Sequence, residues 1–293
     1  MKDDLRLFLN DILKSCQTTS FSKPVDVLSA REDILNNYLP GNRFLSVFDL
    51  RENEFTFVKK EVERVLLYKK EEFTMERLLS MIPPMELFLV LEYAKIAFSL
   101  LRSEFHFQIL REAFHIAFPI LKKGATKPSR IARRSMLFEL EDETPASILE
   151  IWEDVSFRDN TQYVKWSMYA PTEKAAIGMN KYFYNRWVEK LGTGFTLREL
   201  QTLIIAEGGC STEEIAAQMN ISRNTVDEYF KNMKRKIKKV ARRLNDDRIF
   251  TNGIELNIEI PYAMSRLELI RHAHTFGLLP DNILKRYFVD SLQ

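Results

Sequence analysis

The spacing of apolar residues divides the chain into stretches with a helical period and stretches with a strand period. Over residues 1–39 apolar positions recur three and four residues apart, and Pro40-Gly41 ends this pattern. From Phe44 the pattern changes to that of a short strand, the polar cluster 51–54 predicts a turn, and a second strand pattern follows at 55–58. The pattern predicts an N-terminal helical extension over 1–41, followed by a β-hairpin.

Helical spacing fills the middle of the chain, and strand spacing returns after it. Residues 59–101 carry a helical pattern that Pro83-Pro84 interrupts, because proline ends one helix and favours the start of another. Alternation at Phe114–Ile120 is followed by extended stretches at 131–140 and 146–157. We therefore expect an α+β domain over 42–158, with a five-stranded antiparallel sheet and helices between its second and third strands.

The C-terminal third is predicted to be all-α and to follow a partly packed connector. Residues 159–194 mix polar residues with many aromatic ones, which is unlike a flexible linker. Residues 195–293 return to helical spacing, except for an insertion at about 240–264 that includes an extended run from Ile254 to Ile260.

Three successive helices are predicted at the start of this C-terminal domain, and each has its own start signal. The signals are the capping boxes Thr196/Glu199 and Ser211/Glu214 and the helix cap Ser222. A short helix, a tight polar turn and a longer basic helix are typical of a helix-turn-helix, whose second helix enters the major groove of DNA. The third helix, from Arg223 to about Arg243, is expected to be that helix.

One face of this third helix is apolar and the other is basic. The apolar stripe consists of Val226, Phe230, Met233, Ile237, Val240 and Leu244. Eight of the thirteen residues from Lys231 to Arg243 are Lys or Arg and none is acidic, although the chain has a net charge of only +2. Since the same thirteen residues contain no acid to neutralise these cations, they predict a local site for a polyanion.

The same region resembles the LuxR/GerE-type helix-turn-helix. The matching positions run without a gap through Ile237 and include Thr196-Leu197-Arg198-Glu199, Leu203, Gly209, Ser211, Glu214-Ile215-Ala216, Ile221-Ser222, Thr225-Val226 and Lys236. Residues 265–279 look like the closing helix of that family. This resemblance implies a DNA-binding domain of a transcription regulator.

The resemblance also implies a role for individual residues. The base-edge candidates are Asp227, Glu228 and Lys231, and the DNA-backbone candidates are Ser222, Arg223, Asn224, Thr225, Lys234, Arg235 and Lys238. A carboxylate can accept from cytosine N4, and a lysine can donate to guanine O6 and N7. Asp227 and Glu228 are explained equally well as acids that complement the positive N-terminus of the helix.

Three departures from the family pattern matter. Tyr229 stands where the family usually has His, and Cys210 replaces a common apolar residue. The insertion at 240–264 separates the third helix from the fourth, which usually forms the dimer. We still expect a homodimer that reads two half-sites about one helical turn apart, but the insertion leaves its interface open.

The N-terminal α+β region resembles the PAS sensor fold. It shares with that fold the order of elements and the residues Tyr68, Glu71, Glu72 and Pro84, whereas Leu67 and Pro83 depart from the usual stretches. An unrelated small α+β domain is the alternative. The resemblance implies a sensor that could take an unknown small ligand, which fold analogy alone does not identify.

Composition and motifs exclude several other classes of protein. The chain has only 9 Gly and 10 Pro, which favours a helix-rich fold, and its two cysteines, Cys16 and Cys210, have no disulfide or zinc spacing. No stretch is apolar enough for a membrane span, no secretion signal is present, and the motifs of nucleotide-binding, serine-hydrolase and zinc-protease sites are missing. We expect a cytoplasmic protein that is not an enzyme and has no metal or other cofactor.

The sequence thus predicts a transcription regulator in which a sensor domain controls a helix-turn-helix reader of double-stranded DNA. RNA polymerase is a further candidate partner, and no membrane partner is expected. Two alternatives stay open: an interaction or scaffold protein whose basic helix binds an acidic partner, and a sensor whose DNA-binding half has decayed. Both would bind DNA weakly and without regard to its sequence.

Overall fold

The computed structural model describes residues 41–101, 107, 110–142, 144–246, 254–280 and 282–290. The predicted helical extension over 1–41 lies outside the described residues except for Gly41. The chain divides into two compact units, Met1–Met179 and Asn180–Gln293. Their boundary falls inside the segment 159–194 that the sequence predicts to be a connector.

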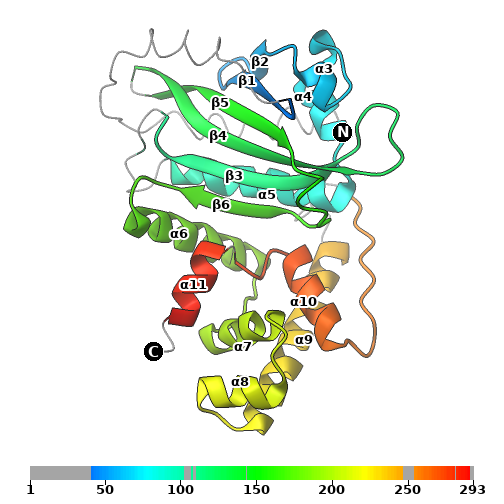
Figure 1. The fold of residues 1–293 in the computed structure, drawn as a ribbon, viewed down its shortest axis with the longest axis vertical. Coiled ribbons are helices and arrows are strands. Elements are labelled where there is room, and N and C mark those ends of the chain that lie inside the picture. The colour runs from blue at the N-terminus through cyan, green and yellow to red at the C-terminus, as the bar shows by residue number, and fades with distance from the viewer. Residues whose placement is uncertain are drawn as a thin grey trace. The chain divides into compact units, whose positions relative to one another are not determined.

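A six-stranded antiparallel sheet forms the framework of the first unit (Figure 1). Its strands are β1 (Arg43–Asp49), β2 (Glu54–Val58), β3 (Ala113–Ile120), β4 (Ser129–Glu141), β5 (Thr144–Asp154) and β6 (Lys165–Tyr169). The strands lie in the order β2-β1-β5-β4-β3-β6. The long β4–β5 pair, which runs from Ile131 opposite Asp154 to Glu141 opposite Thr144, is at the centre.

The sheet has one strand more than the five predicted. The additional strand, β6, lies in the predicted connector and pairs with β3, where Trp166 is opposite Ile116. Its five residues are too few for alternation to distinguish a strand from an aromatic-rich loop. Trp166 and Met168 are buried, so this part of the connector belongs to the core of the first unit.

Helices lie between β2 and β3, as the sequence predicts. They are α3 (Val62–Val65), the 3-10 turn η1 (Lys70–Glu72), α4 (Met75–Ser80) and α5 (Pro84–Leu100). Pro84 occupies the first turn of α5, where its missing N–H leaves no hydrogen bond unmade. Phe44 of β1 stacks on Trp152 of β5 with ring centroids 5.6 Å apart, and Phe73 meets both rings edge-on. The predicted antiparallel sheet with interposed helices is confirmed.

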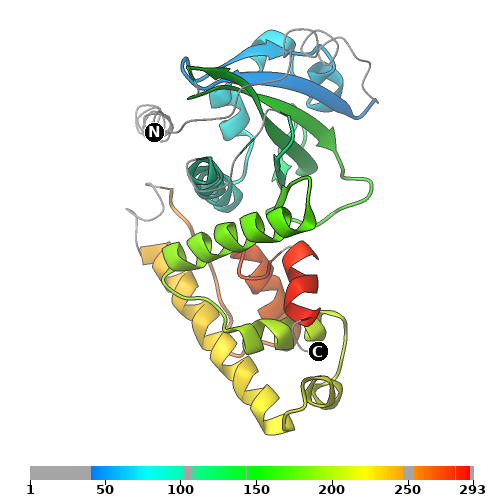
Figure 2. The same cartoon turned by 90° about the vertical axis from the view of Figure 1, so that its left-hand side faces the viewer.

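The second unit is helical (Figure 2). Its elements are the C-terminal part of α6 (Glu173–Leu191), then α7 (Leu197–Glu207), α8 (Thr212–Met219), α9 (Arg223–Asp246), α10 (Arg266–Thr275) and α11 (Asn282–Asp290). Helix α9 is longer than the predicted end near Arg243, and α11 was not predicted. None of the helices described for this chain is long and apolar enough to cross a membrane.

Two aromatic residues of the predicted connector anchor α6 to the helical unit. The indole N–H of Trp187 donates to the carbonyl of Phe276 at 2.9 Å, and the hydroxyl of Tyr184 donates to the carbonyl of Leu278 at 2.9 Å. Both side chains are buried. The aromatic residues of the connector therefore serve two different cores.

Candidate nucleic-acid interface and ligand cavity

The first two helices of the helix-turn-helix begin at capping boxes, as predicted. The amide of Thr196 donates to the Glu199 carboxylate at 2.6 Å, and the amide of Glu199 donates to the Thr196 hydroxyl at 3.3 Å. Ser211 and Glu214 repeat this pair of hydrogen bonds at 2.7 and 3.2 Å. Each box satisfies backbone donors that the first turn of a helix leaves unpaired.

The turn between α8 and α9 depends on a left-handed residue and a serine cap. Asn220 ends α8 at φ 52° and ψ 50°, a conformation that asparagine tolerates better than most residues. The hydroxyl of Ser222 accepts from the amide of Thr225 at 3.1 Å and also lies 2.9 Å from the Thr225 hydroxyl. These interactions fix the direction in which α9 starts.

The apolar face of α9 forms the core of the helical unit. All six residues of the predicted stripe are buried, together with Ala241. Helix α9 packs against α8, α7 and α10, and Ile215, Ala216 and Met219 of α8 are also buried. Because the whole stripe is used in packing, the opposite face of α9 is left to solvent.

The predicted contact residues lie on this solvent-facing side of α9. Ser222, Arg223, Asn224, Asp227, Glu228, Lys231 and Arg235 are exposed, and Thr225, Lys234 and Lys238 are half-buried. The Lys231 ammonium lies 3.3 Å from Glu228, but the two side chains are 78% and 60% exposed. An ion pair this exposed contributes little, so Lys231 can exchange it for another partner.

Not every cation of the basic run is available to a ligand. Lys236 lies 2.6 Å from the buried carboxylate of Glu199, an ion pair that joins α9 to the start of α7. Lys238 donates to the carbonyl of Tyr262 at 2.8 Å. Lys236 is thus structural, and one of the three N–H donors of Lys238 is already used inside the protein.

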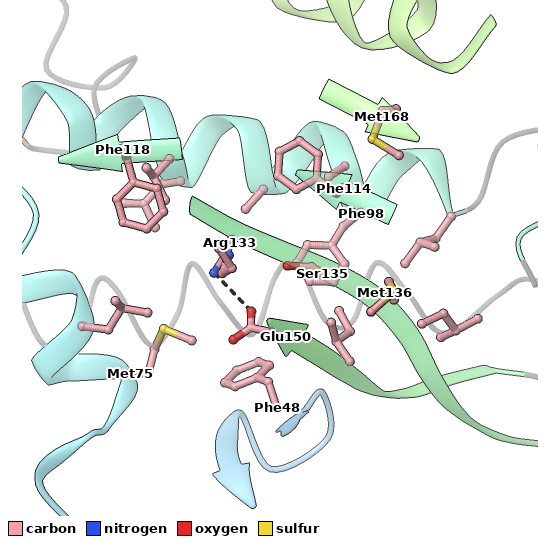
Figure 3. Close-up of a pocket in the computed structure, with 18 of the residues that line it drawn as sticks. Phe48, Met75, Phe98, Phe114, Phe118, Arg133, Ser135, Met136, Glu150 and Met168 are labelled. Atoms are coloured by element: carbon pink, nitrogen blue, oxygen red, sulfur yellow. Dashed lines mark ion pairs between the residues drawn. The ribbon is translucent and has the colours of Figure 1, made fainter. Parts of the chain in front are cut away.

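The first unit contains a cavity of about 120 Å³ between its sheet and the helices α4 and α5 (Figure 3). Its wall is mostly apolar and includes Phe48, Phe98, Phe114, Phe118 and Met168. For comparison, a dry apolar cavity of roughly 150 Å³ in another protein holds benzene. The volume therefore suits a molecule with a single ring.

Four polar residues interrupt the apolar wall: Glu112, which precedes β3, and, from two neighbouring strands, Arg133 and Ser135 of β4 and Glu150 of β5 (Figure 3). The Arg133 guanidinium is 3.2 Å from the Glu150 carboxylate, which also accepts from the hydroxyl of Ser46 at 3.1 Å. Burial raises the pKa of Glu150, whereas Arg133 and Ser46 oppose that rise. Within the described structure, Arg133 Nε and Ser135 Oγ have no hydrogen-bond partner. Both atoms could donate to an acceptor on a bound molecule.

These polar residues of the cavity were not identified from the sequence. Both strands carry several other polar residues, so the sequence alone did not single out Arg133 and Glu150. Their pairing across strands depends on the β4–β5 register. Among the residues described, no group of three or more His, Cys, Asp or Glu side chains could hold a metal ion.

Comparison with known proteins gives one match of sequence. Residues 193–243 match the family described as bacterial regulatory proteins, luxR family (GerE). No curated protein sequence matches the chain.

Several solved structures are similar over much of the chain at low identity. A phage VqmA–DPO complex has 12% identity over 86% of this chain and 88% of that one, with a TM-score of 0.29. A Vibrio cholerae VqmA dimer has 15% identity over 88% of this chain and 92% of that one, with a TM-score of 0.29. An RNA-binding Light-Oxygen-Voltage receptor has 12% identity over 73% and 56% of the two chains, with a TM-score of 0.31. Likenesses with TM-scores this low carry no conclusion about this chain.

The matched segment contains the whole of α7 and α8 and most of α9. It holds both capping boxes, the Asn220 turn and the basic face of α9. Residues 193–243 are a luxR-family helix-turn-helix domain.

Proposed function

We propose that this protein is a sequence-specific regulator of transcription that binds double-stranded DNA through α9. The observation that carries the proposal is the exposed basic face of α9 within a luxR-family helix-turn-helix. Asp227, Glu228 and Lys231 are assigned to base edges. Ser222, Arg223, Asn224, Thr225, Lys234, Arg235 and Lys238 are assigned to the sugar-phosphate backbone. Lys238 can donate to a phosphate while it still donates to the Tyr262 carbonyl, because an ammonium group has three N–H donors.

In this proposal the protein is cytoplasmic and binds DNA as a homodimer on two paired half-sites. Dimeric helix-turn-helix proteins bind operators whose symmetry matches their own two-fold symmetry. RNA polymerase is a candidate partner because a regulator bound near a promoter can contact it. Co-purification of polymerase with the DNA-bound regulator, but not with the free regulator, tests this second partner separately.

A binding titration tests the central proposal. Duplexes selected from a random pool by the full chain are compared with unselected duplex over a range of salt concentrations. A specific reader should prefer the selected duplex by a factor on the order of a thousand or more. Equal and weak binding to both duplexes would instead support a scaffold protein whose basic helix meets an acidic partner, or a decayed reader.

We propose further that the first unit is a sensor whose cavity takes a small ligand with one ring and a hydrogen-bond acceptor. The apolar wall suits the ring, and Arg133 Nε and Ser135 Oγ suit the acceptor. Such a ligand would bury the apolar wall and satisfy two buried donors at once.

Benzamide is a suitable first probe, because its ring matches the cavity and its carbonyl is an acceptor. We expect it to raise the thermal midpoint of the full chain more than toluene does, and to lose this advantage in Ser135→Ala. A cavity-filling change on α5, Ala94→Leu, should alter DNA affinity if cavity and reader are coupled, whereas Ala125→Leu in an exposed loop should not. If neither benzamide nor Ala94→Leu changes the affinity for DNA, the proposed sensor role is contradicted.

A further inference from the structure

The segment between α9 and α10 runs back along α9, so it lies beside the helix that is proposed to bind DNA. The described residues of the insertion beyond the end of α9, 254–264, are called the arm here; the arm contains neither helix nor strand. Figure 2 shows this segment, in orange, beside α9. The arm is anchored at its end by Met264, which is buried, and by Ser265, whose side chain caps α10.

Two side chains of α9 hold the arm at defined points. The side-chain amide of Asn245 donates to the carbonyl of Ile258 at 3.0 Å and accepts from the amide of Ile258 at 2.9 Å. Lys238 donates to the carbonyl of Tyr262 at 2.8 Å, and its ammonium lies 5.2 Å from the centre of the Tyr262 ring. Lys238 and Asn245 are seven residues apart, which is two turns, so they lie on one side of α9.

The same side of α9 carries the leading candidate for base contact. Lys231 precedes Lys238 by seven residues and is therefore in line with both residues that hold the arm. The arm thus covers the C-terminal half of this side and leaves the turns around Lys231 open. Tyr262 lies at the end of the arm that is nearer Lys231.

The Tyr262 side chain is poorly explained by the fold of the chain itself. The residue is 96% exposed, the highest value among the exposed large hydrophobic residues of the described structure. Lys238 nevertheless binds the carbonyl of this residue and lies beside its ring. A large aromatic side chain that is held in place without being buried is suited to an external partner.

The surroundings of Tyr262 favour a sugar-phosphate backbone over an apolar protein surface. The Lys238 ammonium is beside the ring, and Arg235 and Arg242 are exposed on the same side of α9. An apolar partner would have to remove these cations from water without pairing them, which is costly. A phosphate pairs with them and accepts a hydrogen bond from a tyrosine hydroxyl.

We propose that Tyr262 is a DNA-backbone contact, positioned by Lys238 and Asn245, that extends the interface beyond the turns around Lys231. This inference rests on the proposed DNA-binding function. Glu255 and Glu259 are exposed on the arm and would repel phosphates, so the contact is confined to the Tyr262 end.

The test compares variants of the full chain on the selected duplex. Tyr262→Ala should weaken binding about three- to tenfold, the range expected for removing one hydrogen bond. Tyr262→Phe should weaken it nearly as much, because the hydroxyl is the donor. The salt dependence of binding should not change, since no cation is removed. Phe157→Ala is the matched control, because this ring is also exposed, at 75%, and also has a cation beside it, Arg158 at 5.7 Å; it should bind like the wild type.

Hydroxyl-radical footprinting separates a contact from a change in folding. Tyr262→Ala should lose protection only at the outermost backbone positions. Asn245→Ala, which releases the arm but retains the tyrosine, should lose protection at the same positions.

An unchanged affinity and footprint in Tyr262→Ala, with the wild type still specific, would overturn this inference and leave the proposed function standing. An unchanged footprint with an altered oligomeric mass would also overturn it, because Tyr262 would then belong to an interface between copies. Failure of the wild type to prefer any duplex would remove the proposed function itself.

Discussion

The Lys236 ammonium lies 2.6 Å from the Glu199 carboxylate, and Glu199 also caps the start of α7. Glu199 is buried and Lys236 is 22% exposed, so the pair is largely shielded from solvent. One cation of the basic run therefore holds the helix-turn-helix together, whereas neighbours such as Arg235 and Lys239 are exposed to solvent.

Loss of this ion pair should reduce stability, because Lys236→Ala leaves a buried carboxylate unpaired. We expect the free energy of unfolding of the helical unit to fall by about 2–4 kcal/mol. The control is Lys239→Ala, which removes an exposed cation three residues away. It should change the free energy of unfolding by less than about 0.5 kcal/mol. Amide hydrogen exchange in α7 and α9 measures the change in stability of both variants. Weaker DNA binding by Lys236→Ala with unchanged exchange would instead make Lys236 a DNA contact.

Lys231→Ala distinguishes reading of a base from binding of a phosphate. If Lys231 donates to guanine, the variant should lose about 1–3 kcal/mol of binding free energy on duplexes with that guanine and little on duplexes without it. Titration of a set of duplexes with single base-pair changes measures this difference. An equal loss on every duplex would assign Lys231 to a phosphate.

Arg235→Ala should weaken binding about equally on all duplexes, since this exposed residue is assigned to the backbone. Removing one cation from a phosphate should reduce the slope of log affinity against log salt by about 0.9. Titrations at several salt concentrations give the slope. A slope identical to that of the wild type would exclude the assignment of Arg235 to a phosphate.

Replacing only one partner of the Arg133–Glu150 ion pair should lower stability, because the other charge is left buried and unpaired. Glu150→Gln removes the charge that faces a guanidinium only 12% exposed, and should lower the free energy of unfolding of the first unit by about 2–4 kcal/mol. Adding Arg133→Met should recover part of this loss, because the unpaired charge is then gone. Urea unfolding of the four members of this cycle measures the coupling. Additive losses would show that the two side chains do not interact.

Acid should weaken the helical unit through Glu207. Burial alone would raise the pKa of Glu207, but hydrogen bonds from His274 and Lys285 outweigh burial and lower the pKa to about 2. A carboxyl with a lowered pKa in the folded state stabilises the fold above its unfolded value of about 4.3 and loses that contribution as the pH falls towards the folded value.

Between about pH 5 and pH 2, the wild type should therefore lose about 1–3 kcal/mol more stability than Glu207→Gln, which has no carboxyl to titrate. Unfolding of both proteins at several pH values gives the difference. Parallel pH profiles would show that the interactions of Glu207 with His274 and Lys285 contribute nothing.

Local features of this chain were predictable from sequence because they depend on neighbouring residues. The capping boxes at Thr196 and Ser211 join residues three apart, and the apolar stripe of α9 follows the helical period. The same reasoning found the strands β1 to β5 through alternation and turn residues. It did not find β6, whose identity as a strand depends on the edge of β3 rather than on its own pattern.

The sequence by itself determined the helix-turn-helix, the concentration of cations on α9 and the order of elements in the first unit. The tertiary structure alone decided which cations are held inside the protein, where the connector aromatics pack and what lines the cavity. Glu199 and Lys236 are 37 residues apart, Trp187 and Phe276 are 89 apart, and Ser46 and Glu150 are 104 apart. The physical reason is that periodicity and capping record interactions within a few residues, whereas a pairing across such separations exists only after the chain has folded and brought its partners together.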